Sequence, residues 1–208
     1  MMKDGARQDG AKHPAIGWVL STAFVLVSLF ASCVLPVEYP PGVLVAEDPV
    51  QKRVTGLQVF EVGDFLVRPL AHFSIEARVL SRKRYRMGRD SDLSPVDLAL
   101  GWGAMSDQAV LDRLEIWQGG RFFYWRTGQL PIPEREVIEH SSNMHMIPAE
   151  ETVRDALLSV REGDLVEVEG YLVVATAEGG WIWRSSLSRK DSGNGACELV
   201  YVTRIEVR

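Results

Sequence analysis

The sequence predicts an α+β protein, mainly β, in which one N-terminal transmembrane helix is followed by one β-rich domain with two or three short helices. Three observations predict this class. Residues 14–37 contain no acidic or basic side chain, as expected of a membrane span. From about residue 55 onward, short runs of alternating apolar and polar residues are separated by glycine turns, which is typical of β-strands. Signals for the start of a helix occur at only three places in that part of the chain.

The composition excludes several classes of protein. The chain has 208 residues, 46% of them hydrophobic, and only two cysteines. This excludes a disordered chain, a collagen-like repeat and a disulfide-rich miniprotein. The formal net charge is −5 at pH 7, so no global positive field attracts the protein to nucleic acid or to anionic lipid. Either role would need a local basic patch.

Residues 15–36 form the predicted transmembrane helix. At a rise of about 1.5 Å per residue, a helix of this length spans roughly 33 Å, which matches a hydrocarbon core of about 30 Å. Such a helix satisfies its own backbone hydrogen bonds, as lipid requires. Trp18 lies near one end, where an indole ring favours the membrane–water interface.

Basic residues on the two sides of the span predict its orientation. Lys3, Arg7 and Lys12 precede it, whereas no Lys or Arg follows it until Lys52. Because cytoplasmic flanks carry the excess of positive charge, residues 1–14 are predicted to be a cytoplasmic tail. In a bacterial cell this makes a single-pass protein of the inner membrane with a periplasmic C-terminal domain.

Two alternatives to an uncleaved anchor stay open. A cleaved secretory signal would have a shorter apolar core and an Ala-x-Ala-like site. A lipoprotein signal is the sharper alternative, because residues 29–33 read Leu-Phe-Ala-Ser-Cys and place small residues before Cys33. The bulky Phe30 and the apolar residues that follow Cys33 favour the uncleaved anchor.

Residues 37–54 are predicted to be a Pro-rich extended linker. Pro36, Pro40 and Pro41 prevent the helix from continuing and favour extended backbone. No second linker, repeat or low-complexity run follows, so residues 55–208 are predicted to form a single exported domain.

Strand signals dominate this domain. Residues 71–79 alternate cleanly, with Ala, Phe, Ile, Ala and Val facing one way and polar residues the other. Residues 116–125 are predicted to form a hairpin, because Gly119 and Gly120 supply the positive φ angles of a tight turn.

Three helices are predicted, at residues 94–101, 106–114 and 148–163. The first opens with a capping serine and a proline at the first helical position. The third has acidic residues in its first turn and an apolar stripe that includes Val153 and Leu157.

The C-terminal third is predicted to be a meander of three successive strands, at residues 165–175, 181–184 and 197–202. Strands, one helix and then further strands follow one another as in a small closed barrel such as the OB-fold. Residues 163–170, Gly-Asp-Leu-Val-Glu-Val-Glu-Gly, resemble a strand of that fold after a Gly-Asp turn. The resemblance implies that the exported domain is OB-like or another small barrel.

A second resemblance concerns location. Residues 93–103, together with residues 185–189 and 195–198, are similar to an uncharacterised group of single-span bacterial envelope proteins. This resemblance implies a place in the inner membrane and carries no known activity.

Three histidines, His72, His140 and His145, are the candidate ligands for a metal ion. However, five residues separate His140 from His145, which is not the same-face spacing of a zincin helix, and no HExxH motif occurs. No metal, cofactor or catalytic residue is therefore predicted.

Two groups of residues are candidates for binding a ligand. Residues 139–148 form the densest polar cluster and are predicted to be a loop; its candidates are Ser142, Asn143 and His145. These side chains either hydrogen-bond the loop and cap the next helix, or they contact a ligand. Trp181 and Trp183 are two residues apart and share one face of a strand. Paired indoles either pack a barrel or form a platform for a carbohydrate or peptide.

A basic stretch at residues 78–89 supplies the candidates for an anionic partner, which are Arg82, Lys83, Arg84 and Arg86. Such a run either binds a polyanion or lipid headgroups, or it is the charged, solvated extension of a strand. Nucleic acid is not predicted as a partner, because an exported domain rarely meets it.

The sequence thus predicts a membrane-anchored envelope protein whose exported domain is a binding or assembly module without catalytic activity. Its predicted partners are the membrane, through the N-terminal helix, and other envelope proteins. The alternative is an anchored hydrolase or metal-dependent enzyme that uses His72, His140 and His145. That alternative requires two of these imidazoles to converge with a carboxylate in one concave pocket.

Overall fold

The fold is taken from a computed structural model, which describes residues 35–56, 58–188 and 196–208. The predicted transmembrane segment and Cys33 lie outside these ranges, apart from the last two residues of the segment. Within the described ranges, no helix combines the length and the apolar character that a bilayer crossing requires.

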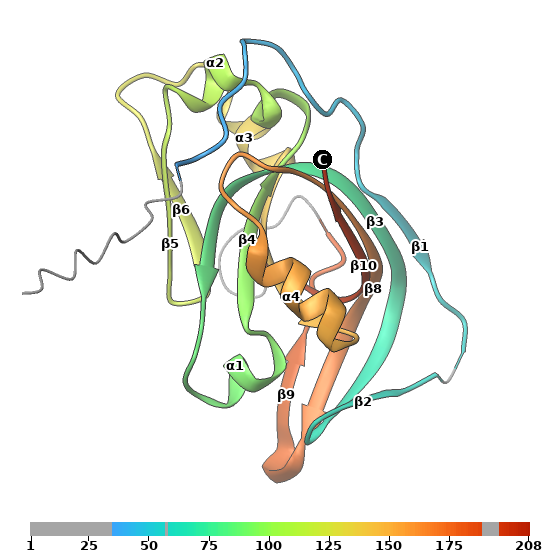
Figure 1. The fold of residues 1–208 in the computed structure, drawn as a ribbon. Helices are drawn as coiled ribbons and strands as arrows, with labels where there is room; N and C mark the ends of the chain where they lie inside the picture. The colour runs from blue at the N-terminus through green and yellow to red at the C-terminus, as the bar shows by residue number, and fades with distance from the viewer. Residues whose placement is uncertain (1–34, 57, 189–195) are drawn as a thin grey trace, which may run out of the picture. The chain divides into compact units, whose positions relative to one another are not determined.

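Five strands form a closed ring and make the centre of the domain (Figure 1). They are β3 (Phe65–Arg84), β4 (Val96–Gly101), β7 (Ser141–Pro148), β8 (Leu165–Ala177) and β10 (Glu198–Val207). Their order around the ring is β3-β4-β7-β10-β8 and back to β3. All neighbours are antiparallel except β7 and β10, which are parallel. The prediction of a mainly β domain is confirmed.

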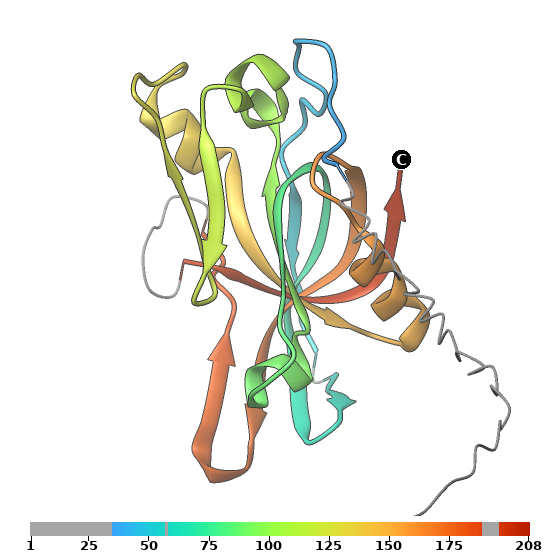
Figure 2. The ribbon, with the colours of Figure 1, turned by 60° about the vertical axis from the view of Figure 1, so that its left-hand side comes forward.

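The ring closes because β3 is long enough to pair with two partners. Its first part pairs with β8 from Leu66 to Arg78, and its last part pairs with β4 from Arg78 to Arg84. The register shifts once in each part, between Pro69 and Ala71 and between Val79 and Ser81. Bulges of this kind bend a strand and increase its twist, so this strand curves around the core, as Figure 2 shows.

The apolar face predicted for residues 71–79 fills the ring. Phe73 and Ile75 of that face contact a core that also contains Leu98 of β4 and Met144 of β7. Helix α4 (Glu151–Ser159) connects β7 to β8 and adds Leu157, which is fully buried, to the same core. Burying one leucine side chain contributes roughly 1.5–3 kcal/mol. The apolar stripe predicted for this helix is confirmed, and the helix is shorter than predicted.

Residues 37–54 lie along the domain rather than forming a free linker. The backbone N–H of Val37 donates to the Glu162 carbonyl at 2.9 Å, and the N–H groups of Leu44 and Val45 donate to the Ser106 hydroxyl. Strand β1 (Val50–Arg53) then pairs with β3. The prolines correctly indicate extended backbone, but they do not show that its hydrogen-bonding groups find partners in the domain.

A long insertion connects β4 to β7. It contains a 3-10 turn (η1), two helices and a separate two-stranded sheet: η1 Gly103–Ser106, α2 Gln108–Leu111, β5 Glu115–Gly119, β6 Phe122–Arg126 and α3 Glu134–Glu139. The predicted hairpin is confirmed as β5 and β6. Its turn lies one residue later than predicted, because Gly120 and Arg121 occupy the two positive-φ positions, at 59° and 70°.

Two elements differ in type from the prediction. The predicted helix at residues 94–101 is strand β4, preceded by a short helix, α1 (Arg89–Leu93). The predicted polar loop at residues 139–148 is mostly strand β7. In both cases alternate residues, such as Leu98 and Met144, enter the core, and burial across the ring outweighs the local capping and polarity signals.

The predicted meander order is also wrong. Strand β9 (Trp181–Arg184), which follows a short turn, η2 (Glu178–Gly180), pairs with β8, but β10 lies on the other side of β8. Strand β2 (Phe60–Val62) completes the sheet by pairing with β3.

We expect Gly163→Ala to destabilise the domain by roughly 3 kcal/mol or more. Gly163 has a φ of 88°, where a Cβ costs about 1–2 kcal/mol, and that Cβ would also lie 2.0 Å from the Val37 carbonyl oxygen. Gly179 has a φ of 78° and no neighbour within 4 Å, so Gly179→Ala isolates the backbone strain. Urea unfolding of residues 34–208, followed by tryptophan fluorescence, measures both; equal losses would contradict the close docking of Val37.

Candidate functional site

The candidate site lies on the outer face of β4 and β7. Asp97 and His145 alternate with core residues of these strands and therefore face away from the interior of the ring. An outward face of a barrel normally meets water, yet Asp97 is 0% exposed and His145 is 2% exposed. Residues of the β5–β6 hairpin and of β9 contact this face and bury it.

Arg121, at the tip of the β5–β6 hairpin, provides the counter-charge. Its Nη1 lies 2.7 Å from Asp97 Oδ1 and also donates to the Ser94 carbonyl at 3.0 Å. Among the described residues, Arg121 is the one non-glycine with positive φ, a conformation that costs a side-chain-bearing residue about 1–2 kcal/mol. The hairpin therefore accepts backbone strain at the position that pairs with the buried acid.

Aromatic rings surround the same guanidinium. Its central carbon lies 3.7 Å from the centre of the Tyr85 ring and 5.4 Å from that of the Trp183 ring. Trp183 also packs against His145, with 4.6 Å between ring centres, and meets Trp181 edge to face. Cation–π contacts of this kind contribute about 0.5–2 kcal/mol each, more when they are removed from water.

The Asp97 carboxylate is incompletely satisfied. His145 Nδ1 lies 2.9 Å from Oδ1, but the ring is not aligned for a linear hydrogen bond. The second oxygen, Oδ2, is buried and has no hydrogen-bond partner of normal geometry among the described residues. Burial, and secondly the negative charge of Asp97, raise the pKa of Tyr85 to about 12. The phenol of Tyr85 thus stays protonated beside the acid.

Polar side chains fix the hairpin to the barrel beside this cluster. Gln118 Nε2 donates to Asn143 Oδ1 at 2.6 Å, and Asn143 Nδ2 donates to the Arg121 carbonyl at 3.0 Å. The Cys197 thiol lies 3.8 Å from the same carbonyl oxygen. These contacts fix the position of Arg121, because both its side chain and its backbone are bound.

A hollow of about 330 Å³ opens beside Arg121. It is lined by Asp90, Arg121, Phe122, His145, Trp181, Ile182, Trp183, Arg184 and Cys197. This volume is at the lower end of the range for small-molecule sites. Indole rings present apolar faces and guanidinium groups present paired donors, so the hollow suits a ligand that combines a flat apolar group with an anionic or hydroxyl group.

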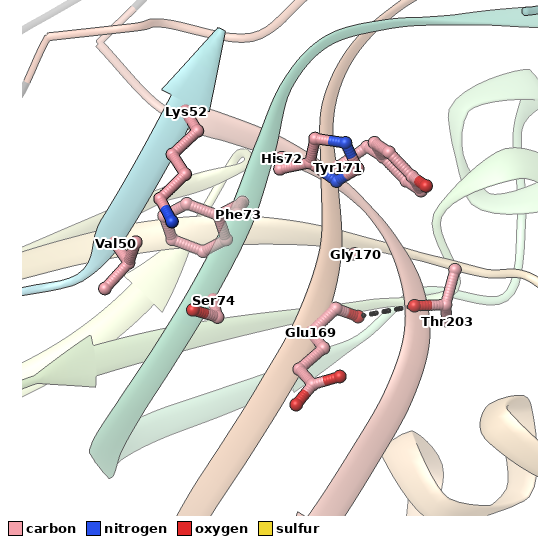
Figure 3. Close-up of a pocket in the computed structure, with 9 residues that line it drawn as sticks. All are labelled: Val50, Lys52, His72, Phe73, Ser74, Glu169, Gly170, Tyr171 and Thr203. Atoms are coloured by element: carbon pink, nitrogen blue, oxygen red, sulfur yellow. Dashed lines mark hydrogen bonds between the residues drawn. The ribbon is translucent and has the colours of Figure 1, made fainter. Parts of the chain in front are cut away.

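A second hollow, of about 420 Å³, lies on the outer surface between β1, β3, β8 and β10 (Figure 3). His72 borders it and packs against Tyr171, with 4.7 Å between ring centres. Thr203 donates to the Glu169 carbonyl at its edge, at 3.1 Å. Of the residues that line this hollow, only Phe73 and Gly170 are buried, so it contains no buried charge. We therefore regard it as the weaker candidate.

The three candidate histidines lie in three different surroundings. His72 borders the second hollow, and His145 contacts Asp97 in the first. His140 Nδ1 lies 2.9 Å from Glu136 Oε2, with its ring edge to face with Trp102. Across the described ranges, no three metal-ligating side chains gather into one group.

The ligand candidates divide into two sets. His145, Trp181 and Trp183 line the hollow beside Arg121, and Asn143 holds its rim. Ser142 faces the other side of β7, where its hydroxyl donates to Glu198 Oε2.

Two of the four candidate basic residues bind backbone carbonyls within the domain. Arg82 donates to the carbonyls of Leu158 and Val160, at 3.1 and 2.6 Å, and Arg84 donates to the Leu158 carbonyl. These carbonyls lie at the C-terminal end of α4, where positive charge is favourable. Lys83 and Arg86 are exposed.

Asp97, Arg121 and Tyr85 were not among the predicted site residues. The available signal for Asp97 was a single acid within the otherwise apolar residues 96–100, which the helix prediction treated as a first-turn residue. The signal for Arg121 was its place directly after two glycines in a hairpin. Neither pattern shows that the two side chains meet.

No family model, no curated protein and no solved structure matches this chain. The chemistry of the site therefore rests on its own geometry.

We expect Arg121→Ala to cost about 3–5 kcal/mol of unfolding free energy, because it leaves a buried carboxylate without its counter-charge. Removing both partners, in Arg121→Ala with Asp97→Ala, should cost less than the sum of the two single changes. Arg126→Ala is the control on the same hairpin: its ion pair with Glu115 is 70% and 60% exposed, so about 0–1 kcal/mol is expected. Chemical denaturation of all four variants measures the coupling, and strict additivity would contradict a buried ion pair.

Tyr85 should make stability depend on alkaline pH. Its pKa is about 12 in the folded state, compared with 10.0 for an unperturbed tyrosine side chain, so the folded state favours the neutral phenol. The stability that this provides is complete below pH 10 and is lost as pH rises toward 12. Absorbance at 295 nm should show a late tyrosinate step that Tyr85→Phe removes and Tyr124→Phe retains. A titration that Tyr85→Phe leaves unchanged would refute the assignment.

Proposed function

We propose that this protein is a membrane-anchored component of the bacterial cell envelope whose exported β-rich domain binds a partner molecule and has no catalytic activity. The anchor is the uncharged segment at residues 15–36, and the excess of basic residues before it supports a periplasmic domain. The lack of charge over a length that matches a bilayer supports this location.

One observation carries the binding assignment. Two indoles, Trp181 and Trp183, and one guanidinium, from Arg121, converge on a single hollow from segments far apart in the chain. The Arg121 side chain is 16% exposed and is held by a buried carboxylate. A preorganised group of this kind loses little conformational entropy when a ligand arrives, which favours a recognition role.

The order of strands supports the same proposal by analogy of fold. A five-stranded ring with a helix between its third and fourth strands is similar to the OB-fold, which the resemblance of residues 163–170 also implies. Barrels of that kind bind oligonucleotides and oligosaccharides on the face of their second and third strands, with help from neighbouring loops. The corresponding strands here are β4 and β7, whose outer face carries Asp97 and His145. For an exported acidic protein this analogy favours an oligosaccharide or another envelope protein.

The alternative of an enzyme that uses His72, His140 and His145 stays a prediction from sequence alone. It requires two of these imidazoles in one pocket with a carboxylate. The structure places each of the three beside different residues, so no observation favours this alternative over binding.

We expect a photo-crosslinking amino acid at Ile182 to capture the partner in intact cells. Ile182 lines the hollow and is 64% exposed. The same amino acid at Val207, which is 45% exposed at the end of β10, serves as the control and should give no specific adduct. Trp183→Ala should abolish the adduct at residue 182. Trp117→Ala, which removes an exposed indole of the β5–β6 hairpin, should leave the adduct unchanged.

Two results would contradict the proposal. Adducts that survive Trp183→Ala, or that form equally at both positions, would remove the hollow as the binding site. A C-terminal reporter that is active only in the cytoplasm would remove the envelope location itself.

A further inference from the structure

We propose that the surface around Val37 is a lipid-contacting face, held directly on the outer leaflet of the membrane. This face consists of residues 37–39, Leu80, residues 111–116 and residues 161–163. The inference rests on the proposed function, because it takes residues 15–36 to be the membrane anchor. It goes further by assigning a surface of the domain to the bilayer.

The chain is held by the domain from the first residue after the predicted anchor. The Val37 N–H donates to the Glu162 carbonyl at 2.9 Å, and the Val37 carbonyl accepts from Arg78 Nη2 at 3.2 Å. Gly163 leaves room for this contact, since any side chain there would overlap the Val37 backbone. Both polar groups of the Val37 backbone are thus bound.

Arg78 extends this attachment beyond a single residue. It is 3% exposed, and its guanidinium donates to Val37, to the Ser106 carbonyl and to the Gln108 side chain. It also lies 5.1 Å from the centre of the Tyr39 ring. The Tyr39 N–H in turn donates to Gln108 Oε1 at 3.1 Å. Residues 37–39 are therefore part of the domain and not a flexible tether.

The length of the chain then places this face at the membrane. An extended residue advances by at most about 3.6 Å, and Val37 directly follows the last residue of the predicted span. A span that ends at residue 36 leaves Val37 at the level of the lipid headgroups, a region that adds several ångströms on each side of the hydrocarbon core. The surface that surrounds Val37 has no spacer that would hold it away.

The side chains of this face suit a headgroup region. A hollow of about 210 Å³ beside Val37 is lined by half-buried apolar residues, including Leu80, Leu111, Leu114 and Ile116. Exposed charges of both signs border it: Glu38, Asp112, Arg113, Arg161 and Glu162. Three of these charges are acidic and two are basic, so no excess of positive charge ties the contact to anionic lipid. The basic residues Arg82 and Arg84 are already bound to backbone carbonyls at the C-terminal end of α4.

This placement directs the candidate binding site away from the bilayer. In Figures 1 and 2, residues 37–45 and α2 lie at one end of the barrel, whereas the β8–β9 turn lies at the opposite end. Trp181 and Trp183 belong to β9. The hollow that they line is therefore turned toward the periplasmic space, where a soluble or wall-bound partner can reach it.

The test uses the full chain reconstituted in phosphatidylcholine vesicles that carry a nitroxide quencher on the headgroup. A fluorophore is attached to Arg113→Cys, with Glu178→Cys as the matched control, after Cys33→Ser and Cys197→Ser. Both labelled positions are exposed charged residues. We expect the fluorophore at residue 113 to lose most of its emission and the fluorophore at residue 178 to keep it. A flexible Gly/Ser spacer inserted between Pro36 and Val37 should restore the emission at residue 113.

The outcomes separate the two proposals. A chain that fails to float with the vesicles refutes the anchor and with it the proposed function. If the chain floats but the fluorophore at residue 113 is as little quenched as that at residue 178, the anchor stands and the lipid face is wrong. Crosslinks between residues 113 of two copies, with protection from the quencher, would show that a second copy covers this face and would likewise overturn the inference. Quenching that persists after insertion of the spacer would show that the anchor does not impose the contact.

Discussion

A carboxylate that is removed from water needs a counter-charge, and the organisation of this domain depends on how Asp97 obtains one. The outer face of β4 would be exposed in an isolated ring of five strands. Arg121 covers it from the β5–β6 hairpin, 24 residues away in the chain. The ion pair explains why a separate two-stranded sheet lies against the barrel and why a non-glycine residue occupies a strained position in its turn. The aromatic hollow beside Arg121 follows from the same arrangement.

The barrel supplies the rigid frame for this arrangement. Strand β3 bends through two register shifts and pairs with both β4 and β8, so the ring has no free edge among its five strands. Side chains on rigid strands keep their positions better than side chains on loops. The two strand residues of the site, Asp97 and His145, are therefore held by the frame. Arg121 comes from the separate β5–β6 hairpin, and Trp183 comes from β9, which pairs with the ring strand β8.

The N-terminal segment links the domain to its proposed location. Val37, Tyr39 and Gly42 each donate a backbone N–H to an acceptor in the domain. A segment with three prolines near its start would be an extended spacer if the domain did not bind its backbone. Here Glu162, Gln108 and Asp107 accept hydrogen bonds from the N–H groups of this segment and hold it on the domain. The same rigidity brings the surface near Val37 to the proposed membrane.

Local patterns in the sequence determined the character of the domain. The alternation at residues 71–79, the glycine turn after β5 and the apolar stripe of α4 each predict an element that the structure contains, because these signals arise within a few residues. Only the tertiary structure decided that residues 96–101 and 141–148 are strands, and that Asp97, Arg121 and Trp183 meet. Periodicity shows which residues share a face but not what covers that face. The covering elements here come from distant parts of the chain, and the burial energy that selects them appears only when the ring closes.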